Sequence, residues 1–188
     1  AEYLLAPIRA EEEQVSRDGT VKCAFPIETG KVVEGVLIPA KDRMTACISS
    51  QVGCSLSCAF CATGKLKLMR NLTAGEIVDQ VRHIAELAER HHDHRLTNIV
   101  YMGMGEPLLN YRNVLESVDL ITGTPGLGMS PKRITISTAG ISKMIRKLGD
   151  DEVRFNLALS LHAAQDEKRN QIMEINETND LASLRDAL

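Results

Sequence analysis

Three cysteines stand close together in the segment GCSLSCAFCATG, at residues 53–64. Cys54, Cys58 and Cys61 follow the pattern C-x3-C-x2-C, and thiolates at this spacing can surround one compact metal centre. A structural zinc site usually has two C-x2-C pairs, and here no second pair or nearby histidine is present. A disulfide would leave one thiol over. The spacing therefore favours a four-iron cluster held by three thiolates, with one iron open to a further ligand.

The composition is that of an ordinary globular protein. Of the 188 residues, 44% are hydrophobic and 25% are charged, which excludes disordered and fibrous classes. The net charge is −3, so a site for a polyanion must be a local patch. An odd count of five cysteines fits a reducing compartment and a metal or redox role. Because the sequence has no apolar run of about 18 residues and no signal-peptide core, we expect a cytoplasmic protein without a membrane partner.

The pattern of apolar residues predicts an antiparallel segment followed by alternating helices and strands. Thr73 and Glu76 form a capping box before a helix with an apolar stripe. Turn-forming residues in ETG (28–30) and PAKD (39–42) separate the first three strands. The expected strands are residues 20–27, 31–38, 44–50, 98–103, 133–138 and 155–161, and the expected helices are residues 73–90, 111–122, 141–151 and 164–173.

This order of elements predicts an α/β fold. Strands that alternate with helices imply right-handed βα units around a parallel sheet. We expect a partial (β/α) barrel with about four βα units, preceded by a small antiparallel β meander. Residues 1–43 would form a β-rich extension and residues 44–188 the core. The sequence begins without Met, and LASLRDAL ends within an expected helix, so we expect a fragment of a longer chain.

The loops that follow the four parallel strands are expected to share one rim, because working residues gather at the carboxyl ends of such strands. These loops contain the three cysteines, GMGEP (103–107), STAG (137–140) and SLHA (160–163). Gly103 and Gly105 permit close backbone approach, and Glu106 offers a carboxylate to an ammonium group. Taken alone, the glycine-rich segment also fits a tight turn, Ser137 a helix cap and His162 a structural histidine.

The cysteine motif, with Phe60 before its last cysteine, resembles the signature of the radical S-adenosylmethionine (SAM) enzymes. Longer segments, among them ACISSQVGCSLSCAFCATG, MGMGEPLLNYRNV and LALSLHAAQDEKRNQIMEIN, resemble the dual-specificity RNA methyltransferases. These enzymes methylate carbon 2 of an adenine in large-subunit (23S) ribosomal RNA and, in many members, in transfer RNA. The resemblance implies a [4Fe-4S] cluster, SAM, a 5′-deoxyadenosyl radical and a methyl-cysteine intermediate.

The resemblance also implies roles for particular residues. Glu34 matches an active-site proton acceptor, a role that its place in an expected strand does not reveal. Cys47, which by its position alone is a buried strand thiol, matches a thiol that resolves a covalent enzyme–RNA adduct. It does so by forming a disulfide with a methyl-carrying cysteine near the C-terminus. The implied cluster ligands are Cys54, Cys58 and Cys61, and the implied SAM contacts are Phe60, Gly105, Glu106, Ser137, Ser160, Leu161 and His162.

One departure from the family pattern affects the expected activity. No cysteine follows Cys61, so the methyl carrier is absent from this sequence, as are the family's N-terminal accessory domain and its last βα units. We therefore expect the chain to be inactive by itself. Three other hypotheses remain: a radical SAM enzyme with a different substrate, an iron–sulfur electron-transfer or binding module, and a zinc-bound loop.

An RNA substrate needs cations, and two basic groups are candidates. Lys65, Lys67 and Arg70 directly follow the cysteines and form a local patch for phosphates. Within the second group, the cations at residues 143–147 fit an ordinary solvated helix face equally well. The resemblance further implies an external electron donor such as flavodoxin, and we expect a monomer. The second basic group contains Lys132, Arg133, Lys143, Arg146 and Lys147.

Overall fold

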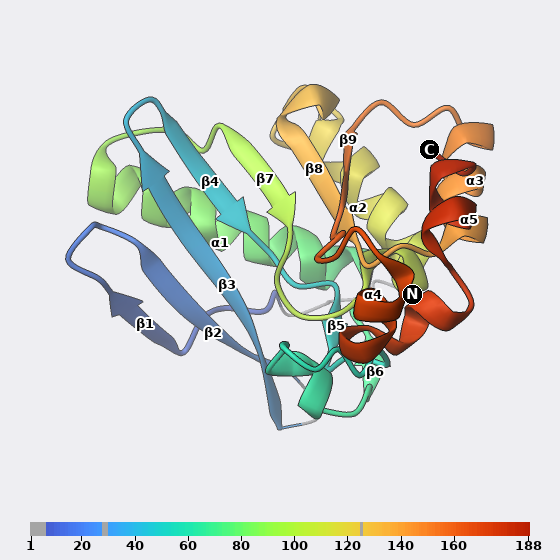
Figure 1. The fold of residues 1–188 in the computed structure, drawn as a ribbon. Helices are drawn as coiled ribbons and strands as arrows, with labels where there is room; N and C mark the ends of the chain where they lie inside the picture. The colour runs from blue at the N-terminus through green and yellow to red at the C-terminus, as the bar shows by residue number, and fades with distance from the viewer. Residues whose placement is uncertain (1–6, 28–29, 125) are drawn as a thin grey trace, which may run out of the picture.

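A seven-stranded mixed sheet forms the centre of the fold in the computed structural model, which describes residues 7–27, 30–124 and 126–188 (Figure 1). The strand order is β1-β2-β3-β4-β7-β8-β9. Strands β1 to β4 pair antiparallel, and β4, β7, β8 and β9 pair parallel. The bounds are β1 (Glu12–Val15), β2 (Val21–Ile27), β3 (Lys31–Ala40), β4 (Arg43–Cys47), β7 (Asn98–Tyr101), β8 (Ile134–Thr138) and β9 (Asn156–Leu159).

Each parallel strand leads into a helix, so the predicted partial barrel with four βα units is confirmed. In the described part of the chain the sheet stays open, with β1 and β9 at its edges. A separate two-stranded sheet holds the ends of the cysteine segment, through β5 (Gln51–Val52) and β6 (Arg70–Asn71). The helices are α1 (Ala74–His92), α2 (Tyr111–Thr122), α3 (Ser142–Asp150), α4 (Asp166–Ile172) and α5 (Leu181–Arg185), with 3-10 turns η1 (Thr63–Lys65), η2 (Pro107–Asn110), η3 (Pro131–Arg133) and η4 (Glu174–Glu177).

The predicted elements recur with small shifts at their ends. The capping box is present: the Thr73 hydroxyl accepts from the Glu76 amide, and the Glu76 carboxylate accepts from the Thr73 amide. The strand expected at 44–50 ends at Cys47, because Ser49 turns away to hydrogen-bond Gln80 of α1. Strand β1 was not predicted, since its four residues, EEQV, are all exposed. Residues 28 and 29 of the predicted ETG turn lie outside the described residues.

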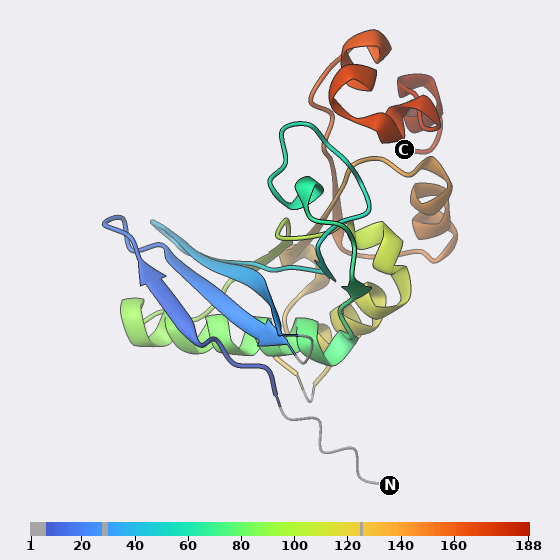
Figure 2. The same cartoon turned by 90° about the horizontal axis from the view of Figure 1, so that it is seen from below.

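Helices α1, α2 and α3 cover one face of the sheet, and the other face is left open by the described helices (Figures 1 and 2). Alternation along each strand sends apolar side chains to the covered face. In β3, for example, Val33 and Leu37 are buried, whereas Val32 and Glu34 are exposed. Within the described residues, no helix has the length and apolar character needed to cross a membrane.

Candidate active site

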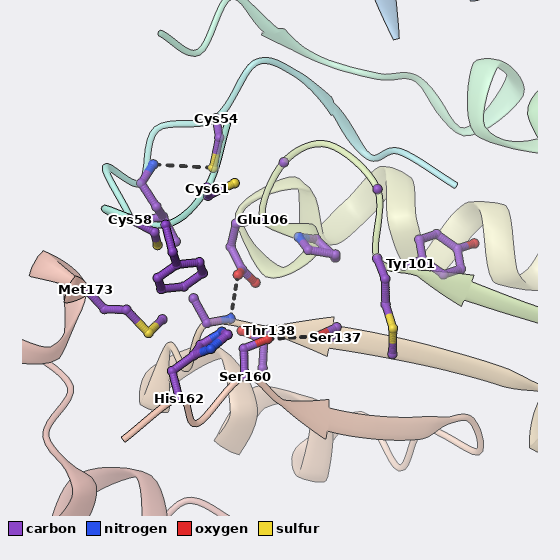
Figure 3. Close-up of a pocket in the computed structure, with 17 residues that line it drawn as sticks. Cys54, Cys58, Cys61, Tyr101, Glu106, Ser137, Thr138, Ser160, His162 and Met173 are labelled. Atoms are coloured by element: carbon purple, nitrogen blue, oxygen red, sulfur yellow. Dashed lines mark hydrogen bonds between the residues drawn. The ribbon is translucent and has the colours of Figure 1, made fainter. Parts of the chain in front are cut away.

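The four predicted rim loops surround one cavity of about 310 Å³ at the carboxyl ends of the parallel strands. Figure 3 shows the thiols on one side of this cavity and the ends of β8 and β9 on the other, with Glu106 between them. The rule that parallel strands gather their following loops at one edge therefore held. The lining residues are Cys54, Leu56, Cys58, Phe60, Cys61, Tyr101, Met102, Gly103, Gly105, Glu106, Pro107, Ser137, Thr138, Ala139, Ser160, His162 and Met173.

Backbone hydrogen bonds shape the cysteine loop and fix it to the rest of the rim. The Cys61 amide donates to the Cys58 carbonyl over 3.1 Å, and the Ala59 amide donates to the Ile172 carbonyl of α4 over 2.9 Å. The Leu56 amide donates to the Cys54 sulfur over 3.4 Å. Burial raises the pKa of both the Cys54 and the Cys58 thiols. A positive centre bound between them would reverse this shift, because metal coordination stabilises the thiolate.

The donor set of this loop fits a thiolate-bound cluster. Three sulfurs from one loop line the same cavity, and soft thiolates are the usual ligands of iron–sulfur clusters. Among the described residues, no three ligating side chains are close enough to hold a single metal ion. In a multi-iron cluster each thiolate binds a different iron, so the three sulfurs lie farther apart than the ligands of a single metal ion.

Glu106 carries a buried carboxylate without a cationic partner among the described residues. Its side chain is 3% exposed and accepts hydrogen bonds from the amides of Ala139 (2.7 Å) and Leu108 (3.1 Å). Burial nevertheless raises the pKa of this carboxyl group. The backbone reaches this position through Gly105, whose φ of +97° and contact with Gln51 leave no room for a Cβ. A ligand ammonium group would compensate the buried charge.

Ser137 and Ser160 lie side by side where β8 and β9 end. Their hydroxyl oxygens are 3.1 Å apart, close enough to share a hydrogen bond. Strands β8 and β9 pair in parallel register, with Ser137 opposite Ala158, so the two hydroxyls reach the cavity together. This pair offers both a donor and an acceptor to a polar ligand group.

Phe60 and His162 form an aromatic contact across the mouth of the cavity. Their ring centroids are 4.2 Å apart, with planes tilted by 41°. His162 has a φ of +58°, which is unusual for a residue other than glycine. Such backbone conformations cluster at functional sites. Leu161, between Ser160 and His162, does not line the cavity, and its side chain is exposed.

Glu34 and Cys47 do not line this cavity but lie on the open face of the same sheet. Cys47 is opposite Val36 of β3 and Val100 of β7, and strand alternation places Glu34 on the same face as Val36. The Glu34 carboxylate pairs with the Lys22 ammonium over 2.6 Å. Burial raises the pKa of the Cys47 thiol. All five cysteines are free in the structure, so the disulfide implied by the resemblance has no support in this chain.

Arg169 is a residue of the site's framework that the sequence pattern did not reveal. Its side chain is 0% exposed, although it belongs to a helix segment, DEKRNQI, that reads as solvated. It donates to the carbonyls of Leu161 (3.1 Å) and Ala139 (2.5 Å) and to the Asn176 side chain. Arg169 thus fixes two rim loops to α4 and η4, a role that no local sequence signal indicates.

The fold and site together define an α/β protein with a three-thiol cofactor site at the rim of a parallel sheet. The chain belongs to the radical SAM superfamily, whose family model matches residues 48–182. Membership in this superfamily implies, in general, a [4Fe-4S] cluster and SAM as cofactors.

Individual relatives agree over nearly the whole chain. A probable dual-specificity RNA methyltransferase RlmN from Cytophaga hutchinsonii is 61% identical over 99% of this chain and 51% of the relative. A protein of the same name from Flavobacterium johnsoniae is 55% identical over 99% of this chain and 53% of the relative. The crystal structure of a radical SAM methyltransferase from Sphaerobacter thermophilus superposes with a TM-score of 0.92 at 41% identity, over 96% of this chain and 53% of that chain. The chain spans about half the length of the curated relatives it matches, and the predicted family resemblance is confirmed.

Proposed function

We propose that this chain is the central catalytic part of a radical SAM methyltransferase that methylates carbon 2 of an adenine in 23S ribosomal RNA and in transfer RNA. The observation that carries the proposal is the single rim cavity, which combines three thiols, a buried uncompensated carboxylate and paired hydroxyls. The names of the relatives supply the reaction class and the RNA substrate.

The proposed cofactor contacts follow from the chemistry of each group. Cys54, Cys58 and Cys61 would hold the cluster through three of its irons, leaving the fourth open to SAM. When bound, the cluster and SAM supply one-electron chemistry that can act on an unreactive carbon. The Glu106 carboxylate would accept the ammonium group of SAM, and its two backbone donors fix its orientation.

The remaining rim residues suit the other parts of SAM. The hydroxyls of Ser137 and Ser160 would bind its ribose or its carboxylate, because they can donate and accept. The rings of Phe60 and His162 would contact its adenine, since both flank the cavity. Leu161 would contribute through its backbone, because its exposed side chain does not line the cavity.

For the RNA, we propose Glu34 as a proton acceptor and Cys47 as the thiol that resolves a covalent adduct. Their common position on the open face of the sheet supports this pairing. An external electron donor such as flavodoxin, a monomeric enzyme and a cytoplasmic setting complete the proposal. Residues 44–188 would be the radical SAM core and residues 1–43 its β-rich extension, which agrees with a family match that starts at residue 48.

Spectroscopy tests the cofactor part of this proposal. After anaerobic reconstitution and reduction, we expect an electron paramagnetic resonance signal from a four-iron cluster that changes when SAM is added. Cys58→Ala should lose the signal, whereas Glu106→Gln should keep the signal but weaken the response to SAM. A reduced signal that SAM leaves unchanged in the unsubstituted protein would favour an iron–sulfur electron-transfer module instead.

Mass spectrometry of RNA tests the reaction. We expect 2-methyladenosine in ribosomal RNA when the gene that contains this sequence is expressed in cells lacking this modification. The 188-residue chain alone should yield none, because no cysteine follows Cys61 to carry the methyl group. A SAM-responsive cluster without 2-methyladenosine would point to a radical SAM enzyme with another substrate.

A further inference from the structure

A second cavity lies on the outer side of the cysteine loop, apart from the proposed cofactor site. It has a volume of about 250 Å³. The two cavities are separated by single residues of the backbone: Gly53 lines this one and Cys54 the other, and Met104 lines this one between Gly103 and Gly105 of the other. The lining residues are Lys31, Val32, Val52, Gly53, Lys65, Leu66, Lys67, Met69 and Met104. We call this cavity the lysine groove.

The cysteine loop itself builds the lysine groove by returning along its own start. The Cys54 amide donates to the Leu66 carbonyl over 3.2 Å, and the Met69 amide donates to the Val52 carbonyl over 2.9 Å. Gly53 allows this close approach, because it has a φ of +74° and a Cβ there would lie 2.3 Å from the Lys67 carbonyl oxygen. The same backbone that presents the thiols therefore also fixes the two lysines of the loop.

The charge of the lysine groove is positive and uncompensated among the described residues. Lys31 comes from β3, and Lys65 and Lys67 come from the cysteine loop. Among the described residues, no acidic side chain lines the groove, and none of the three ammonium groups has an ion pair or hydrogen bond with any of them. In a chain with a net charge of −3, such a local group of cations selects a polyanion.

Apolar side chains complete the groove. Val32, Leu66 and Met69 are each about half exposed, and Met104 forms a buried floor. Ammonium groups can bind a phosphate, and the aliphatic side chains beside them can pack against the flat face of the adjoining base. A base can present this face only when it is unpaired, so the fit is to a single-stranded segment.

We propose that the lysine groove binds two phosphates and an unpaired base of the RNA substrate, next to the nucleotide that is methylated. This inference rests on the proposed function for the identity of the polyanion. The target adenine must leave its stack to reach the rim cavity, and a neighbouring nucleotide held in the groove would keep the strand in place. Lys31 of β3 extends the predicted basic patch beyond the cysteine loop.

Fluorescence anisotropy with a labelled single-stranded RNA from the target region tests this inference in the full-length protein. Lys31→Gln/Lys67→Gln removes two proposed phosphate contacts, and Lys41→Gln/Lys168→Gln removes the same charge from exposed positions outside the groove. We expect the groove variant to bind about 10-fold more weakly, and its salt slope of log K to fall by about 1.4, at about 0.7 per contact. The control variant should change the affinity by less than about twofold.

A second pair of variants tests the apolar surface. Leu66→Ser should weaken binding of the single strand without changing the salt slope, whereas Leu120→Ser, at an exposed position of α2, should leave binding unchanged.

The inference is wrong if both lysine variants lose affinity equally, or if the groove variant binds RNA normally. If the groove variant binds RNA normally but has a lower melting temperature, the lysines serve the packing of the protein itself and the inference is also wrong. An unsubstituted protein that methylates RNA while the groove variants bind normally would leave the proposed function intact.

Discussion

Replacement of Arg169 by methionine tests whether one buried cation holds the rim together. The guanidinium donates to Ala139, Leu161 and Asn176. Methionine has a similar length and no donors, so the Ala139 carbonyl and the Asn176 side-chain oxygen lose the protein donor they have in the structure. The Leu161 carbonyl keeps the Ala163 amide at 2.7 Å. Two buried acceptors without partners cost about 1–3 kcal/mol each.

Removing the buried charge offsets part of this cost, because the guanidinium no longer has to be desolvated. We therefore expect Arg169→Met to lower the free energy of unfolding by about 3 kcal/mol. For a chain of this size, that corresponds to a fall in melting temperature of about 6–12 °C. The matched control is Lys168→Met, one residue away on the exposed side of α4, which should change stability by less than about 0.5 kcal/mol.

The affinity for SAM gives a second measurement, and Arg169→Met would leave it unchanged if Arg169 only stabilised the fold. Arg169 holds the Ala139 carbonyl, and the Ala139 amide holds the Glu106 carboxylate. We expect reconstituted Arg169→Met to keep its iron content but to bind SAM at least about 10-fold more weakly, the equivalent of 1.4 kcal/mol. Equal melting temperatures for the two variants would refute the energetic reasoning. A destabilised variant with unchanged SAM affinity would refute the positioning role.

Other expected outcomes concern single groups. Burial raises the pKa of the Glu106 carboxyl group above 4.5, so the folded state holds the carboxyl proton more tightly than the unfolded state does. In urea melts of the cofactor-free protein, the free energy of unfolding should therefore fall as pH rises from 4.5 through the raised pKa. Glu106→Gln should flatten that fall, and parallel curves would contradict it. Cys23 is fully buried, with its pKa raised to about 12, so mass spectrometry after iodoacetamide treatment at pH 8 should find Cys54 modified and Cys23 intact. Thr73→Ala, which removes the α1 cap, should cost about 1 kcal/mol in thermal melts, and an unchanged melting temperature would argue against the capping box.

Local sequence rules were sufficient for the helices and for the membership of the rim. Helix α1 followed from its capping box and apolar stripe, and the four rim loops followed from the order of strands and helices. The end of β4 could not be predicted in this way, because it depends on hydrogen bonds between the Gln80 side chain of α1 and both backbone groups of Ser49. Arg169 was missed for a related reason: its burial depends on the carbonyls of two different loops, one of them 30 residues away. Contacts of this kind arise only when the chain is folded.

The ion pair of Glu34 bears on its proposed role as a proton acceptor. A carboxylate held by Lys22 at 2.6 Å must exchange partners before it can act on a substrate. Both side chains are about half exposed, at 49% for Glu34 and 47% for Lys22, and ion pairs in such surroundings contribute only about 0.2–1 kcal/mol. Breaking the Glu34–Lys22 ion pair therefore lowers the equilibrium constant for binding a new partner by a factor of about five at most. Because Cys47 shares the same open sheet face, an RNA base that enters from the rim would meet a carboxylate that is free to exchange partners and a thiol kept protonated by burial.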